Sequence, residues 1–424
     1  MTPSSAIEKD NYAKIDAENE RAAIAQTDTA DSREVCEREN KKYVFIARGS
    51  SHIKYFNAFA QQTSLDVQVI KINKHPFLPS HLMGLKQVKN IDINKLLEAY
   101  LAKKASKYNA ISHTFLWAFY RHAMRTILKL DIVKSMSLIC NANADVVGVW
   151  NGQKLPSSSI AEAAKALGKE VVYFENGLLP NSTTCDWSGV NCKNSLPKSG
   201  EFYRKYHSEA PLPNKLISRK PIAKKASGAR EHSLPEQYVF VPFQVETDSQ
   251  IISNSPWIKT MRQLFEYLVT AIEKVNNPHL HIVIKEHPSE KKRHDDLHDI
   301  HPRIVFANQW ETQKLIEKSQ AVLTINSTVG IESLLLNKPV LTMGNACYGL
   351  DGVSLPIHSE GSLLEALNQL ERCQGNPEIT KGFLHFLNEH YAIPTAWNNM
   401  DGRHVEALNK RLTKQDLLSK IASA

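Results

Sequence analysis

The chain has 424 residues, of which 42% are hydrophobic and 23% are charged, and its formal net charge is +8 at pH 7. This length is too great for one ordinary core and the composition is typical of globular proteins, so we expect two domains rather than a disordered chain. No apolar run reaches the roughly 18 residues that a membrane-spanning helix needs. The N-terminus does not read as a secretory leader, and the six cysteines do not form a disulfide framework or zinc-ligand spacing, which together indicate a reducing cytoplasm.

The net positive charge favours anionic partners such as nucleotides, acidic glycans or an anionic membrane surface. A basic surface that serves only solubility is the alternative. We expect no nucleic-acid partner, because the sequence has no zinc-finger spacing, no aromatic RNA-binding motif and no long arginine-rich block.

Residues 1–40 are polar and contain few large apolar side chains, so we expect a flexible lead-in. Ordered structure is predicted to begin with a strand over 43–47, followed by a loop at 48–51. Helical patterns dominate from about residue 93 to residue 140.

A strand–helix–strand unit follows, because "DVVGVWNG", "SSSIAEAAKALGK" and "EVVYFENG" alternate between the two patterns. The serines predict a helix start and the glycine a helix end. Such a unit is right-handed with parallel strands, and its valine-rich strands are covered on both faces. The loop-rich, basic segment from 185 to 236 is predicted to link two domains.

The same alternation resumes after the linker. Strands are predicted at "YVFVPFQ", "LHIVIKEHP", "RIVFA", "AVLTINST" and "KPVLTMG", and helices at 257–275, "TQKLIEKS" and "VGIESLLLN". A further helix is expected over about 405–424. The predicted fold is therefore α/β, with two doubly wound parallel-sheet domains facing a central cleft, divided as 1–40, 41–235, 236–395 and 396–424. No dinucleotide-binding glycine motif and no P-loop motif occurs.

Ligands of open parallel sheets bind outside the carboxyl ends of the strands, so the polar residues at those ends are the candidate site. In the first domain they are Arg48, Gly49, Ser50, Ser51, Asn151, Gly152, Glu175, Asn176 and Gly177. In the second domain they are the run from Gln244 to Asp248, then Lys285, Glu286, His287 and Pro288, and then Asn326, Ser327 and Thr328.

Two of these groups suit a phosphate. His287 and Lys285 can supply positive charge, and Pro288 fixes the backbone that presents the histidine. Ser327 and Thr328 lie where a strand gives way to a helix, whose first N–H groups favour anions. A solvated loop histidine and ordinary helix capping are the alternatives.

Four acids are candidates for other roles. Glu311 and Glu332 could accept hydrogen bonds from a ribose or could be solvated helix acids. Asp248 and Glu175 follow apolar strands in different domains. Two carboxylates around a sugar centre suffice for nucleophilic glycosyl transfer, although the spacing does not by itself pair these two.

The blocks "FENGLLPNSTTCDWSGVN", "VPFQVETDSQI", "IKEHPS" and "NSTVGIESLLLNKPVLTMGNACY" resemble the bacterial capsule polysaccharide synthesis proteins. They are most similar to the retaining β-Kdo glycosyltransferases, which use CMP-Kdo to build capsule or lipopolysaccharide O-antigen glycans. The resemblance covers roughly 140–350 and implies a GT-B fold.

The resemblance also implies roles for individual residues. His287, Pro288, Ser327 and Thr328 would hold the CMP phosphate. In the CMP-sialic acid transferases, to which this GT-B fold is related, a motif of two acids and a glycine bears the catalytic base. Here it reads Glu175, Asn176 and Gly177, so Glu175 is the acid/base candidate.

Asp248 would form the covalent sugar adduct with net retention, and neither a metal nor a cofactor is implied. The expected partners are CMP-Kdo and a glycan acceptor, which could be lipid-linked and reached by peripheral contact at the inner face of the inner membrane. The residues 48–51 and 151–155 are expected to shape the acceptor site. Asp186 is expected to close a loop rather than to catalyse.

Three alternatives stay open. The chain could be another CMP- or CDP-dependent transferase, such as a sialyltransferase or a polyol-phosphate polymerase. It could be a non-catalytic glycan- or nucleotide-binding module, or one module of a larger polysaccharide-synthesis protein.

Overall fold

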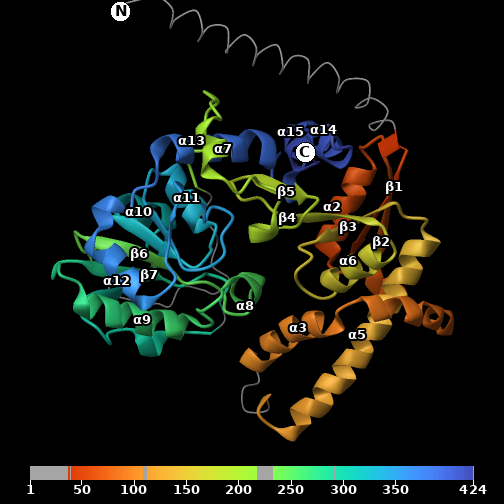
Figure 1. The fold of residues 1–424 in the computed structure, drawn as a ribbon, viewed down its shortest axis with the longest axis horizontal. Coiled ribbons are helices and arrows are strands. Elements are labelled where there is room, and N and C mark those ends of the chain that lie inside the picture. The colour runs from red at the N-terminus through yellow and green to blue at the C-terminus, as the bar shows by residue number, and fades with distance from the viewer. Residues whose placement is uncertain (1–36, 39, 108–111, 217–232, 291, 424) are drawn as a thin grey trace, which may run out of the picture.

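The computed structural model describes residues 37–38, 40–107, 112–216, 233–290 and 292–423. Most of the predicted lead-in over 1–40 and part of the predicted linker therefore lie outside the described residues. The described chain forms two parallel-dominated six-stranded sheets with helices packed on them (Figure 1). The prediction of two doubly wound α/β units is confirmed.

The first sheet has the strand order β12-β5-β4-β3-β1-β2. Its parallel strands are β1 (Lys42–Ala47), β2 (Asp66–Lys71), β3 (Val146–Trp150) and β4 (Glu170–Asn176). Two antiparallel strands extend it at one edge, β5 (Ser182–Asp186) and β12 (Ile393–Pro394). Helices cover this sheet, namely α2 (Ser50–Ala60), α3 (Ile93–Lys107), α5 (Phe115–Asn141) and α6 (Ser157–Ala166).

The second sheet has the order β11-β10-β9-β6-β7-β8, and all its paired strands are parallel. The strands are β6 (Tyr238–Pro242), β7 (His281–Lys285), β8 (Ile304–Phe306), β9 (Ala321–Thr324), β10 (Val340–Thr342) and β11 (Leu355–Pro356). The helices of this part of the chain are α8 (Ser249–Asn254), α9 (Met261–Lys274), α10 (Thr312–Lys318), α11 (Val329–Leu335), α12 (Glu360–Asn368) and α13 (Pro377–Phe386).

The apolar residues of α9 explain why this helix packs on the second sheet. Apolar residues recur at helical spacing at Met261, Leu264 and Leu268. Each of these side chains is at most 1% exposed and belongs to the core of the second sheet. Each such side chain stabilises the fold by about 1.5–3 kcal/mol. The helix begins at Met261 rather than at the predicted 257, because Thr260 is extended and its side chain caps the Gln263 N–H.

The end of the chain returns to the first sheet. Besides β12, the helix α14 (Gly402–Leu412) packs there, and Tyr55 Oη lies 2.8 Å from Nε2 of its buried His404. The single helix predicted over 405–424 is wrong, since α14 and α15 (Leu417–Ser423) are separate helices. The break occurs where Lys414 takes a left-handed conformation with φ 57°.

Two other local predictions need correction. Ser50 and Ser51 open α2 instead of lying in a loop, because the chain enters a helix directly after Gly49. The segment from 185 is not all linker: Cys185 belongs to β5, and the short helix α7 (Gly200–Arg204) packs on α13. The proposed domain boundaries stay predictions.

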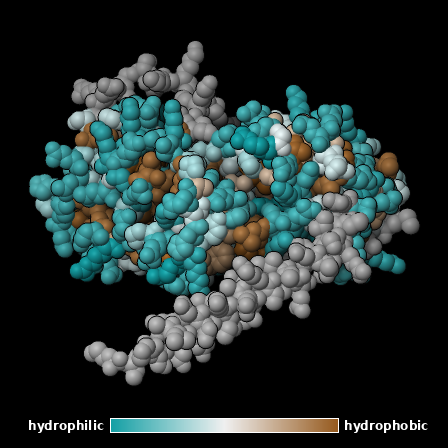
Figure 2. Space-filling view, turned by 90° about the horizontal axis from the view of Figure 1, so that it is seen from above, coloured by the Kyte–Doolittle hydropathy of each residue, from teal (hydrophilic) through white to brown (hydrophobic). Residues whose placement is uncertain are grey.

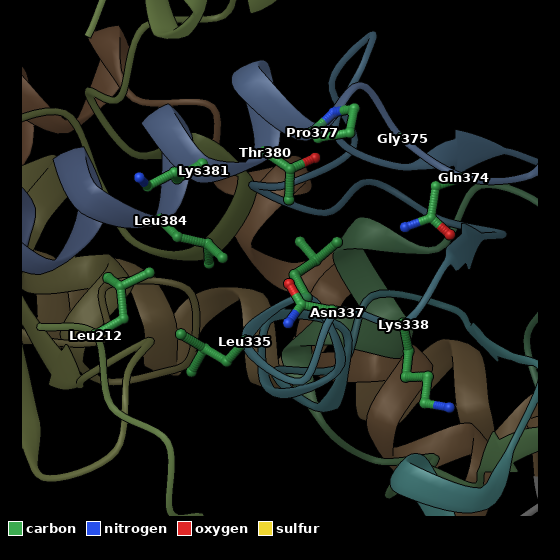
Figure 3. A pocket seen from close by; sticks show the side chains of 11 residues that line it. Leu212, Leu335, Asn337, Lys338, Gln374, Gly375, Pro377, Thr380, Lys381 and Leu384 are labelled. Atoms are coloured by element: carbon green, nitrogen blue, oxygen red, sulfur yellow. The ribbon is translucent and has the colours of Figure 1, made fainter. Parts of the chain in front are cut away.

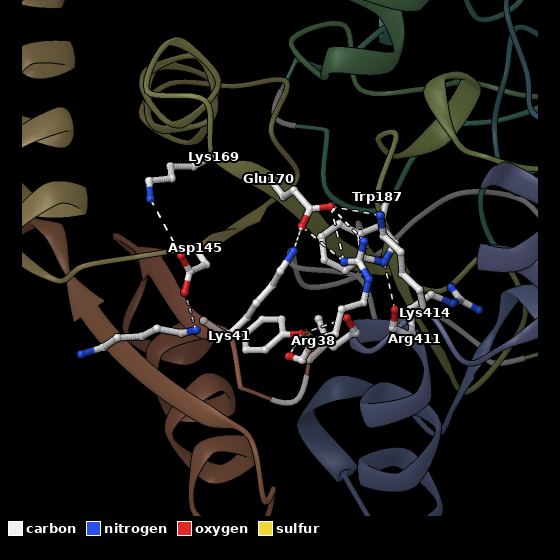
Figure 4. A network of polar contacts seen from close by, with 11 residues as sticks. Arg38, Lys41, Asp145, Lys169, Glu170, Trp187, Arg411 and Lys414 are labelled. Atoms are coloured by element: carbon white, nitrogen blue, oxygen red, sulfur yellow. Dashed lines mark hydrogen bonds and ion pairs between the residues drawn. The ribbon is translucent and has the colours of Figure 1, made fainter. Parts of the chain in front are cut away.

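A charged network ties the two ends of the described chain to the first sheet (Figure 4). Glu170, the first residue of β4, accepts from Lys41 at 2.6 Å, from Lys414 at 3.0 Å and from Arg38 at 3.3 Å. Partial burial alone would raise the pKa of Glu170, but these three cations hold it at about 2. The Glu170 carboxylate is therefore ionised at neutral pH.

The face drawn in Figure 2 is mostly hydrophilic, with separate hydrophobic areas between the polar side chains. Among the described residues, no helix is long and apolar enough to cross a bilayer.

Candidate active site

Glu175 lies at the carboxyl end of β4 and is held by two asparagines. Asn151, which follows β3 in a left-handed conformation (φ 65°), donates from Nδ2 to Glu175 Oε2 at 2.5 Å. Asn176 donates to Oε1 from both its backbone N–H and its side-chain amide, each at 2.9 Å. Trp397 Nε1 donates to Asn176 Oδ1 at 2.8 Å and so fixes the orientation of that amide. The carboxylate is held in one place by neutral donors.

Burial raises the pKa of Glu175 above its ordinary value, and the negative charge of Asp248 adds to the rise. The hydrogen bonds from Asn151 and Asn176 and the positive charge of Lys154 oppose it without cancelling it. Glu175 is therefore a carboxylate that holds a proton more readily than an ordinary glutamate.

Asp248 is the N-cap of α8 in the second part of the chain. It accepts from the Gln250 N–H at 3.0 Å, from Ser249 Oγ at 3.2 Å and from Lys154 Nζ at 2.7 Å. Burial by itself would raise its pKa, but the Lys154 charge and these hydrogen bonds outweigh burial and hold the pKa of Asp248 below its ordinary value. The two acids thus interact, and their environments shift their pKa values in opposite directions.

Lys154 joins the two units of the fold. It lies in the loop between β3 and α6 of the first sheet, whereas Asp248 follows β6 of the second sheet. Lys103 of α3 lies near the charges of Lys154 and Asp248. Burial and Lys154 lower the pKa of Lys103, and the opposing effect of Asp248 does not cancel this. The sequence analysis gave neither lysine a role of its own, although Lys154 lies in the 151–155 loop that was expected to shape the acceptor site. Lys154 could have been suspected, since it stands three residues after Asn151 at a strand end already selected.

A network of amides extends from this contact into the second sheet. Its members are Gln153, Gln244, Gln250, Asn254 and Asn326. Gln153 Oε1 accepts from Asn254 Nδ2 at 3.3 Å across the two units, and Asn254 donates to Gln250 Oε1 at 2.7 Å. Asn326, only 2% exposed, donates from Nδ2 to the carbonyls of Gln250 and Asn254 at 2.9 and 3.1 Å.

Gln244 completes the amide network. It is 7% exposed, donates to Asn326 Oδ1 at 3.0 Å and accepts from the Asn326 N–H at 3.2 Å. Asn326 and Gln244 thus satisfy each other and hold the end of β9 against α8. Their predicted contact with a nucleotide-sugar stays a prediction.

The predicted phosphate residues occupy the adjacent strand ends. His287 and Pro288 follow β7, and His287 Nδ1 accepts from the Ser289 N–H at 3.1 Å. Ser327 and Thr328 lie between β9 and α11, where Ser327 Oγ accepts from the Val329 N–H at 3.2 Å. Because β6, β7 and β9 are parallel neighbours, these residues share one sheet edge with Gln244.

Lys285 and Glu286 make local contacts beside His287. Lys285 Nζ donates to the Trp310 carbonyl, and burial lowers the pKa of this lysine. Glu286 accepts from the His294 N–H at 3.1 Å and from Asn308 Nδ2 at 2.7 Å, which fixes the loops after β7 and β8.

The remaining candidates come from four other positions in the fold. The side chain of Glu311 is 65% exposed at the start of α10 and pairs with Lys314, whereas Glu332 lies in the first turn of α11. Arg48 follows β1 and is exposed, and Ser50 accepts from Lys71 at 3.1 Å. Exposed Ser51 is in α2.

Gly152 and Gly177 lie at strand ends of the first sheet where there is no room for a Cβ atom. A Cβ on Gly152, whose φ is 70°, would lie 2.4 Å from the Tyr173 ring, and one on Gly177 would lie 1.9 Å from Ser182 Oγ. Asp186 closes a loop as expected, since it is fully buried and accepts from the N–H groups of Ser188 and Ser195 at 2.7 and 2.8 Å.

A cavity of about 360 Å³ lies between α11 and α13 (Figure 3). Leu335, Lys338, Thr380 and Leu384 are among its lining residues, and it contains none of the predicted site residues. Among the described residues, no group of three or more His, Cys, Asp or Glu side chains is arranged to hold a metal ion.

Comparison with known proteins gives matches to capsule polysaccharide proteins. Residues 214–365 match the family of capsule polysaccharide biosynthesis proteins. Protein FixF of Sinorhizobium fredii is 37% identical over 275 residues, which cover 64% of this chain and 65% of FixF. The capsule polysaccharide export protein KpsS of Escherichia coli is 26% identical over 258 residues, covering 46% of this chain and 66% of KpsS.

The chain is therefore similar to capsule polysaccharide biosynthesis proteins, the similarity that its motifs indicated. The matched regions span slightly less than two thirds of the length of both relatives.

Solved structures give weaker similarities. The β-Kdo 2,7-transferase of Thermosulfurimonas dismutans KpsC is 21% identical with a TM-score of 0.36, covering 54% of this chain and 74% of that one. The UDP-bound MnaA of S. aureus is 14% identical with a TM-score of 0.38, covering 88% of this chain and 96% of that one. Such TM-scores are too low to define a shared fold.

Proposed function

We propose that the protein is a retaining β-Kdo glycosyltransferase that moves Kdo from CMP-Kdo to a glycan acceptor of a bacterial surface polysaccharide. The family supports surface polysaccharide synthesis as the process. The observation that carries the chemistry is that one loop of the first unit bonds both carboxylates: Asn151 donates to Glu175 at 2.5 Å and Lys154 to Asp248 at 2.7 Å. The pKa values of the two acids are shifted in opposite directions. Such a pair is what a reaction needs when one acid must stay ionised and the other must take up a proton.

Asp248 is the nucleophile in this proposal. Its depressed pKa keeps it ionised at neutral pH, so that it attacks the anomeric carbon while the bond from that carbon to the CMP phosphate oxygen breaks. The electron pair of that bond leaves with CMP, and a covalent aspartyl sugar results. Lys154 is a positioning residue that keeps the carboxylate ionised and aimed.

Glu175 completes the second step. It accepts the proton of an acceptor hydroxyl as that oxygen attacks the anomeric carbon and releases Asp248, so two inversions give net retention. The elevated pKa of Glu175 favours this proton uptake.

The donor phosphate would lie at the edge formed by His287, Ser327 and Thr328. Positive charge and hydroxyl donors there would stabilise the negative charge that grows on departing CMP. Pro288 and Asn326 would shape the same edge, while Asn151 and Gly152 would face the acceptor.

Intact mass spectrometry of the Glu175→Gln variant mixed with CMP-Kdo tests the covalent step. We expect one added Kdo mass, because Asp248 can still attack while the base for the second step is missing. Turnover of Asp248→Asn should fall by about 10³-fold or more. Adduct formation in Glu175→Gln/Asp248→Asn, or near-normal turnover of Asp248→Asn, would show that the nucleophile is misassigned.

CMP release from a panel of donors separates the competing activities. A sialyltransferase or a polyol-phosphate polymerase would consume its own CMP- or CDP-linked donor and leave CMP-Kdo intact. A binding module would bind the nucleotide without turnover and would tolerate Glu175→Gln.

A further inference from the structure

The N-terminal half of α5 carries an uncovered apolar surface. Phe115 and Phe119 are 84% and 79% exposed and lie one helical turn apart. Leu116 and Ile127 are 56% and 50% exposed. At 100° per residue these four side chains fall within an arc of about 120° on the helix. A contiguous strip of large apolar side chains in water marks an interaction surface.

The charge beside this strip has one sign. Arg125 and Lys129 follow on the neighbouring face of α5, and no Asp or Glu occurs between residues 113 and 130. Arg121 forms an ion pair with Glu98 of α3. An apolar strip flanked by cations matches the interface of an anionic bilayer, whose acyl region accepts the rings and whose phosphates accept the cations.

The position of the helix makes this surface accessible. Figure 1 shows α3 and α5 extending from the first sheet, with the first half of α5 projecting beyond both sheets. Helix α3 also borders the carboxylate pair, because it contacts α8, the helix that Asp248 caps. A membrane under these two helices would therefore lie close to the proposed site.

We propose that the first half of α5 docks the protein peripherally on an anionic phospholipid surface. Phe115 and Phe119 would insert at the level of the headgroups, and Arg125 and Lys129 would contact lipid phosphates. This proposal does not depend on the reaction assigned above.

Vesicle flotation tests the docking surface. The protein is mixed with phosphatidylcholine vesicles that contain or lack phosphatidylglycerol, and its partitioning is compared with that of Phe115→Ser/Phe119→Ser. We expect binding to the anionic vesicles, weakened about tenfold or more by the double substitution. The matched control is Ile300→Ser, at a residue that is 54% exposed on the other unit, and it should bind as the parent does. Arg125→Gln/Lys129→Gln should weaken binding to anionic vesicles alone, and added salt should do the same.

Several results would overturn the proposal. Equal binding of the parent and the phenylalanine variant would do so, as would equal weakening by Ile300→Ser. Absence of binding to anionic vesicles would also do so. A concentration-dependent mass that the phenylalanine variant abolishes, without vesicle binding, would assign the surface to a second copy of the chain instead. Thermal melts show whether each variant folds, and turnover on a water-soluble acceptor reports separately on the proposed activity.

Discussion

Lys154 decides the electrostatics of the candidate site at the scale of single residues. Its charge lowers the pKa of Asp248 and also opposes the rise at Glu175. Both acids must reach the carboxylate form in the proposed cycle. The cation therefore widens the pH range in which both are available.

Replacing Lys154 with Met should raise both pKa values, since a stabilising positive charge is lost from each carboxylate. The acidic limb of the pH–rate profile should then move to higher pH, and kcat/KM near neutral pH should fall by roughly 10–100-fold. Lys154→Arg should keep most of kcat/KM and leave the acidic limb close to its position in the parent, because the positive charge is retained.

The control for this experiment is Lys169→Met, which removes a surface partner of Asp145 at 3.9 Å and should leave the profile unchanged. A uniform loss of rate for Lys154→Met, with no movement of the acidic limb, would reduce Lys154 to a structural contact.

At the scale of elements, buried amides position α8 and the end of β9 in addition to the apolar packing of Ile251 and Ile325. Asn326 holds these two elements together through Gln244, Gln250 and the Asn254 carbonyl. Buried amides stabilise only while each donor and acceptor has a partner.

Asn326→Ala should leave the buried Nε2 of Gln244 without its acceptor and remove the two bonds that Asn326 Nδ2 donates to the Gln250 and Asn254 carbonyls. The protein should be destabilised by about 2–3 kcal/mol, measured by urea unfolding. The donor KM should also rise, because Ser327 and Thr328 lose their support. Gln62→Ala, which removes an exposed amide bonded to the Ala58 carbonyl, should change the free energy of unfolding little. Equal stability of the parent and Asn326→Ala would mean that the amide network is dispensable.

At the scale of the whole molecule, Glu170 links both ends of the described chain to β4. Its pKa of about 2 lies below the ordinary value of 4.5, so the folded state favours the ionised form. The resulting stability is fully present above about pH 4.5 and is lost as the pH falls toward 2.

Glu170→Gln should therefore lower the free energy of unfolding by about 2 kcal/mol near pH 7, because Arg38, Lys41 and Lys414 lose their common anion. The difference from the parent should shrink as the pH falls through this window, which urea titrations at several pH values would measure. Glu406→Gln, which removes an exposed i, i+4 pair with Lys410, serves as the control. A difference between parent and Glu170→Gln that does not depend on pH would contradict the assignment.

The sequence by itself determined the alternation of strands and helices, because apolar periodicity is local. The strands around "VVGVW" and "YVFVP" needed no tertiary information, and neither did the βαβ order. It also indicated the strand-end residues, including Glu175 and Asp248, since polar side chains directly after buried strands are visible in one dimension.

Only the tertiary structure decided which of these residues meet. Glu175 and Asp248 are 73 positions apart in the printed sequence, and no local pattern could pair them or place Lys154 beside Asp248. The return of β12 and α14 to the first sheet was equally hidden, because strand pairing and helix docking depend on surfaces that exist only after both units have folded. Local chemistry selected the candidate residues, and only the packing of one unit against the other brought Lys154 to Asp248 and Gln153 to Asn254.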